Sequence, residues 1–162
     1  GNLEWLGRGP HETYPDRWTS GALGRYQGAV EDQLVPYIRP SENANKTHTR
    51  WACLLHENQD KPGLLVAASA PFDFSALPYT TEDLEGAAHP FQLKKRDFVC
   101  LNLDHKLMGV GGDDSWTAAV HKEYLIHPEE FDFSFFLKPV SASTNSRGNT
   151  QMRYYELLGT FL

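Results

Sequence analysis

Several features that mark common functional classes are absent from this sequence of 162 residues. The formal net charge is −6, and Lys94, Lys95 and Arg96 form the only tight basic cluster. A nucleic-acid partner requires a broad positive footprint, which this composition does not offer. No apolar run approaches the ~20 residues of a membrane helix, and no signal peptide is visible at the N-terminus. We therefore expect neither a nucleic-acid nor a membrane partner.

Cysteine is also scarce, with Cys53 and Cys100 as the only two. They form no C-x-x-C motif, and two thiols alone build neither a disulfide framework nor a zinc site. We expect both to be reduced and buried. The histidines are scattered without an H-x-H or H-E-x-x-H pattern, so no metal site is predicted. The triplet Asn45-Lys46-Thr47 matches a glycosylation sequon, a pattern that is frequent by chance.

Helical periodicity is rare because ten prolines and thirteen glycines interrupt the chain. Strand patterns are common, and the expected strands are 50–56, 64–69, 96–104, 130–137 and 153–159. The first two should form a hairpin across turn residues 57–63. In 130–137, alternation places Phe131, Phe133 and Phe135 on one face.

One short helix is predicted at 80–86, with Thr80 or Thr81 as its cap and Gly86 at its end. Short strands with frequent turns predict an all-β antiparallel sandwich or barrel, in a single domain over 1–162. The polar residues 141–150 are predicted to form a mobile loop. The chain has no initiator methionine and opens within a pattern, so we expect it to be part of a longer protein.

Two segments combine turn formers with charge. In 7–17, glycines and prolines fix an irregular path that an ion-pair network of Glu12, Asp16 and Arg17 can pin. A catalytic carboxylate pair is the alternative, but a glycosidase needs two carboxyls roughly 5–10 Å apart, which sequence spacing does not establish. In 36–43, two prolines and Ser-Glu-Asn favour a rigid structural turn over a ligand contact.

The third segment, 101–116, runs from a strand into glycines and ends at Trp116. Glycines allow sharp turns, and an indole at such a loop is well placed as a flat platform for the C–H face of a sugar. Asp113 and Asp114 can accept hydrogen bonds from sugar hydroxyls or from the loop's own amides. Composition alone still favours a structural loop, and adjacent carboxylates argue against phosphate binding.

These three segments resemble, in the same order, blocks of the small-chain domain at the C-terminus of bacterial β-galactosidases of glycoside hydrolase family two. The matching blocks are Gly-x-Gly-Pro-x-Glu-x-Tyr-x-Asp-Arg at 7–17, Pro-Tyr-x-x-Pro-Ser-Glu-Asn at 36–43 and Met-Gly-x-Gly-Gly-Asp-Asp-Ser-Trp at 108–116. The resemblance implies an antiparallel β-supersandwich similar to galactose mutarotases, of which this chain holds the C-terminal part.

The resemblance also implies a function. The intact enzyme hydrolyses terminal β-galactosides such as lactose with retention, and its catalytic glutamates and its magnesium, with sodium as a further candidate, belong to a separate barrel domain. This chain should therefore carry no catalytic residue and no cofactor. Trp116 is implied to line the sugar site, on a loop that Asp113, Asp114 and Ser115 shape. The implied partners are the barrel, the galactoside and, as a further candidate, a second copy of the enzyme.

A stand-alone carbohydrate-binding or mutarotase-like domain is the alternative. A mutarotase needs a general acid and base, for which His11 and Glu12 are candidates. Galactose anomerisation by the chain alone would favour this alternative. For location, the cytoplasm is expected, with the periplasm as the second possibility.

Overall fold

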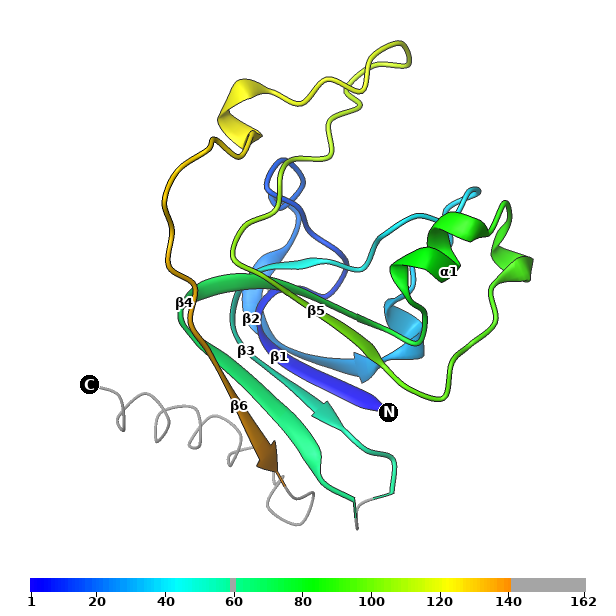
Figure 1. Ribbon diagram of the computed structural model, residues 1–162, viewed down its shortest axis with the longest axis vertical. Coiled ribbons are helices and arrows are strands. Elements are labelled where there is room, and N and C mark those ends of the chain that lie inside the picture. The colour runs from blue at the N-terminus through cyan, green and yellow to red at the C-terminus, as the bar shows by residue number, and fades with distance from the viewer. Residues whose placement is uncertain (59–60, 141–162) are drawn as a thin grey trace.

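The computed structural model describes residues 1–58 and 61–140, which form an all-β domain on one antiparallel sheet (Figure 1). Its strands are β1 (Asn2–Gly9), β2 (Ala22–Ala29), β3 (Lys46–Leu55), β4 (Gly63–Leu77), β5 (Cys100–Asp104) and β6 (Phe135–Val140). The order across the sheet is β2-β1-β3-β4-β5, and β6 also pairs with β4. Over the described ranges the sheet stays open, which is consistent with a sandwich domain and not with a barrel.

The long strand β4 organises the sheet. Along one edge it pairs with β3, and along the other it pairs first with β6 and then with β5. The register of β3 against β4 shifts twice between Lys46 and Trp51. Such irregularities bend a strand and increase its twist. The curvature of β4 in Figure 1 follows this change of partner along its length.

Both faces of the sheet bury apolar side chains. One face carries Leu3, Trp5, Val66, Phe72 and Phe74 among its buried residues. Alternate positions of β3 and β4 point the other way, and they bury Trp51, Cys53, Leu65 and Ala67. Apolar side chains are therefore buried on both faces of the central strands β3 and β4. Cys53 is buried and Cys100 is half-buried, so the expectation of two buried thiols is confirmed for Cys53 only.

The predicted hairpin is confirmed, since β3 and β4 pair antiparallel from Trp51 with Ala67 to Leu54 with Leu64. Both strands are longer than predicted. The strands β1 and β2 were not predicted, although their register runs without interruption from Asn2 with Ala29 to Gly9 with Ala22. The predicted strand 153–159 and the predicted mobile loop 141–150 lie outside the described residues.

For two strands the predicted first residue is several positions before the first residue observed in the structure. The strand expected at 96–104 is confirmed only from Cys100, because the Arg96 amide donates to the Pro78 carbonyl at 2.9 Å and its guanidinium binds Asp83. The strand expected at 130–137 is confirmed only from Phe135. The Phe131 ring instead stacks on His105, with ring centroids 5.0 Å apart.

The predicted helix is confirmed as α1 (Thr81–Gly86), and Thr80 is its N-cap. The Thr80 hydroxyl accepts from the Asp83 amide, and the Asp83 carboxylate accepts from the Thr80 amide, which is a capping box. Three short 3-10 helices are η1 (Glu31–Gln33), η2 (Pro90–Gln92) and η3 (Lys122–Tyr124). No helix in the described part of the chain has the length and apolar character needed to span a membrane.

Candidate functional site

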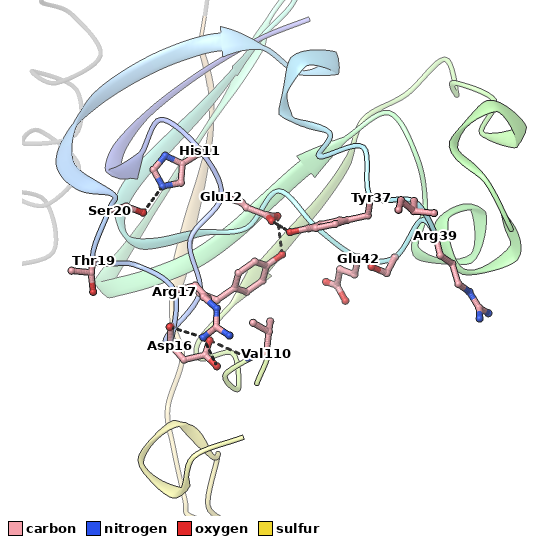
Figure 2. Close-up of a pocket in the computed structure, with 13 residues that line it drawn as sticks. His11, Glu12, Asp16, Arg17, Thr19, Ser20, Tyr37, Arg39, Glu42 and Val110 are labelled. Atoms are coloured by element: carbon pink, nitrogen blue, oxygen red, sulfur yellow. Dashed lines mark hydrogen bonds and ion pairs between the residues drawn. The ribbon is translucent and has the colours of Figure 1, made fainter. Parts of the chain in front are cut away.

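All three segments singled out in the sequence contribute to one cavity of about 950 Å³ (Figure 2). The first segment begins at the end of β1, the second follows η1, and the third begins within β5. The lining residues are His11, Glu12, Tyr14, Asp16, Arg17, Thr19 and Ser20 from the first region, Tyr37, Ile38, Arg39, Ser41 and Glu42 from the second, and Val110 from the third. The fold therefore joins segments that are distant in the sequence.

Glu12 connects the first segment to the second. Its carboxylate accepts hydrogen bonds from the Tyr14 hydroxyl at 3.1 Å, from the Ala44 amide at 2.8 Å and from the Tyr37 hydroxyl. The hydrogen bond to Glu12 raises the pKa of Tyr37 to about 12, and burial raises the pKa of Tyr14 further. Both phenols therefore stay protonated and keep donating to the carboxylate.

The predicted ion-pair network is only partly correct. Arg17 lies 3.6 Å from the Asp16 carboxylate, whereas Glu12 binds two tyrosines and an amide. Asp16 accepts from the backbone amides of Val110 and Gly111 at 3.1 and 2.8 Å. Both carboxylates thus hold chain segments together, which supports the structural interpretation of this segment over a catalytic pair.

The loop after β5 extends away from the sheet (Figure 1) and needs its glycines. Gly111 and Gly112 adopt φ values of 63° and 76°, in the left-handed region that favours glycine. A Cβ on Gly111 would also lie 2.6 Å from the Ala119 carbonyl oxygen. At Gly111 and Gly112 the backbone path would therefore strain any other residue.

Asp113 and Asp114 shape this loop. The Asp114 carboxylate accepts from the amides of Trp116 at 2.9 Å and Thr117 at 2.7 Å, and these bonds lower its pKa. Asp113 pairs with His121 and lies 3.4 Å from Arg17. The hydrogen bond from His121 lowers the pKa of Asp113, and the same bond raises the pKa of His121. Ser115, between Asp114 and Trp116, is exposed.

Trp116 is 85% exposed. By contrast, Trp5 and Trp51 are fully buried in the two apolar clusters. A large aromatic side chain left in solvent at the end of a braced loop is available for a contact outside the domain. The sugar-platform interpretation requires this exposed position.

The sequence interpretation names His11 as a candidate acid or base but assigns no role to Tyr37 and Arg39, which also line the cavity. Their only signal was an aromatic and a basic residue inside a proline-bounded turn. Among the described residues, no three His, Cys, Asp or Glu side chains lie close enough to hold a metal ion.

Comparison with known proteins gives one consistent result. A family model described as the β-galactosidase small chain matches residues 1–137. The chain is 41% identical over 140 residues to a β-galactosidase of Priestia megaterium, covering 86% of this chain and 13% of the relative. It is 40% identical over 141 residues to one of Vibrio cholerae, with 87% and 13% covered. A β-galactosidase of Streptococcus thermophilus is 37% identical over 142 residues, with 86% and 14% covered.

Proposed function

The chain belongs to the β-galactosidase small-chain family, and from this premise we propose that it forms one wall of the sugar site in a larger β-galactosidase. The exposed indole of Trp116 is the observation that carries the proposal. Sugars present C–H groups on one face, and an indole ring binds such a face by dispersion and burial. The Asp114 carboxylate holds the backbone at Trp116 by accepting hydrogen bonds from the amides of Trp116 and Thr117.

In this proposal the intact enzyme hydrolyses terminal β-galactosides, lactose among them, with retention. The two carboxylic acids that this reaction needs belong to a separate catalytic barrel. The engagement of Glu12 and Asp16 with hydroxyls and amides supports that division. We propose that magnesium and sodium bind outside this part of the enzyme, and that the enzyme is cytoplasmic.

A stand-alone mutarotase-like domain is less well supported. The chain spans about 13% of the length of the Priestia and Vibrio relatives, which indicates a part of a larger protein. The proposed acid and base also have separate partners, since His11 bonds Ser20 at 2.9 Å while Glu12 bonds Tyr14 and Tyr37.

Replacing Trp116 with alanine in the whole enzyme tests the proposal. We expect Trp116→Ala to raise KM for galactosides, because losing a stacked aromatic costs on the order of 1–3 kcal/mol of binding. Steady-state kinetics with several aglycones measures this effect. Folding should be little affected because the ring is exposed, which a thermal melt checks.

Trp116→Phe is the matched control. It keeps an aromatic face and should lose less binding than alanine. An unchanged KM for Trp116→Ala across several aglycones would contradict the proposal.

A further inference from the structure

We propose that Asp16 and Arg17 are positioning residues for the sugar site, because together they hold the loop that presents Trp116. This inference rests on the proposed function of Trp116. The two residues belong to the first segment, whose contact with the tryptophan loop was not predicted from the sequence. Figure 2 shows Asp16 and Arg17 beside Val110 at one side of the cavity.

Asp16 binds the loop through its backbone. Its two carboxylate oxygens accept from the amides of Val110 and Gly111, at 3.1 and 2.8 Å. The Asp16 side chain is only 3% exposed. Hydrogen bonds to an ionised acceptor are stronger than neutral ones, and burial from solvent protects them from competition by water. Asp16 therefore holds the loop backbone at Val110 and Gly111 in place.

Arg17 binds the same residue, Gly111, through its carbonyl group. Its Nη2 donates to the Gly111 carbonyl at 2.6 Å and lies 3.4 Å from the Asp113 carboxylate. Asp16 and Arg17 thus hold both the amide and the carbonyl of Gly111. Reciprocal backbone bonds between Tyr14 and Arg17, at 2.9 and 3.2 Å, close the turn that presents these two side chains.

The loop backbone packs closely against Asp16. A Cβ on Gly109 would lie 2.7 Å from the Asp16 carboxylate, so only glycine lets the backbone approach this far. The Gly109 amide also donates to the Tyr124 carbonyl at 2.9 Å. From Gly111 the constraint continues to Asp113, which Arg17 and His121 both contact.

Beyond this anchor the loop is open to solvent. Residues 112–119 are all exposed, so apolar packing contributes little to their position. The place of the indole therefore depends on hydrogen bonds at the base of the loop and on the Asp114 turn at its tip. Displacing a substrate-contacting group by about 1 Å is enough to weaken a site substantially, even when the change is made at a distance.

The test compares Asp16→Asn and Arg17→Lys in the whole enzyme. Asparagine keeps the size of the side chain but loses the charge and one acceptor, and lysine keeps the charge but loses the planar fork. Both variants should raise KM several-fold with a smaller change in kcat. In a Trp116→Ala background, Asp16→Asn should add little, because the loop no longer carries the indole.

Asp83→Asn is the matched control for stability. Asp83 also accepts backbone and guanidinium hydrogen bonds, but at the cap of α1 and from Arg96. It should lower the melting temperature without changing KM. Arg17→Lys keeps the test decisive if Asp16→Asn does not fold, since the Arg17 side chain is 43% exposed and tolerates replacement better.

The outcomes separate the two proposals. If Trp116→Ala raises KM while Asp16→Asn and Arg17→Lys leave it unchanged, the positioning role is overturned and the function of Trp116 stands. Full additivity of Asp16→Asn with Trp116→Ala would also overturn the positioning role. An unchanged KM for Trp116→Ala would instead overturn the proposed function itself.

Discussion

Buried polar residues beside the cavity show how context changes what a residue type does. Asn45 is 3% exposed, and its Nδ2 donates to the Thr13 carbonyl at 2.9 Å. This sequon match is therefore a structural asparagine, inaccessible in the folded domain. Next to it, Lys46 is fully buried over the ring of Trp5, and its Nζ donates to the Ala44 carbonyl. Burial lowers the pKa of Lys46 to about 8, with Glu12 opposing the shift.

Asp73 gives a pH prediction at this scale. Burial raises the pKa of its carboxyl from 3.8 to about 7. As pH rises from about 4 to about 7, the unfolded chain releases this proton before the folded one, so folding becomes less favourable across that window. Above pH 7 both states are ionised and the effect is constant.

Asp73→Asn should remove this penalty while keeping an acceptor for the His48 amide. The gain in free energy of unfolding, relative to the unaltered chain, should therefore grow from about pH 4 to about pH 7. Urea denaturation at both pH values measures it. A gain that is equal at the two values would show that Asp73 does not titrate in this range.

At the scale of elements, the local sequence pattern predicted α1 correctly but did not predict the strands β1 and β2. The β2 sequence contains glycines and charge, and its strand conformation comes from pairing with β1 along the whole length of both strands. Strand propensity depends on such neighbours more than on the residues themselves. Before β5 the opposite occurs: residues 96–99 alternate in a pattern that favours a strand, yet they lie outside β5. The Arg96 side chain instead binds Asp83.

Thr80→Ala tests the cap of α1. Removing the hydroxyl leaves the Asp83 amide without its acceptor and should lower the free energy of unfolding by about 1 kcal/mol. Chemical denaturation measures this change. Thr81→Ala, one position later inside the helix, is the control and should have a much smaller effect. Equal losses for the two variants would contradict the assignment of Thr80 as the cap.

On the scale of the whole molecule, the chain corresponds to a small part of its relatives. It matches β-galactosidases over most of its own length but over 13–14% of theirs. The candidate sugar-facing residue, Trp116, is exposed on the loop that leaves the sheet after β5 (Figure 1). This arrangement suits a domain that contributes a single wall to a site completed elsewhere.

The chain alone should therefore show no glycosidase activity. We expect no hydrolysis of a chromogenic galactoside above the buffer rate, because a retaining mechanism needs two carboxyl groups at a set separation. An intact β-galactosidase relative, assayed in parallel, provides the positive control. Turnover that copurifies with the chain and is lost in Glu12→Gln would show that it carries its own catalytic centre.

The sequence by itself determined the local features of this protein: the all-β class, the β3–β4 hairpin, the short helix capped at Thr80 or Thr81, and the unusual character of three segments. These local features depend on residues that are close in the sequence, so the sequence pattern is enough to predict them. Only the tertiary structure decided that Asp16 meets the glycine loop 94 to 95 positions later, and that Glu12 binds Tyr37 and not Arg17. Such contacts follow from strand register and from the bend of β4, and both are set by packing across the sheet.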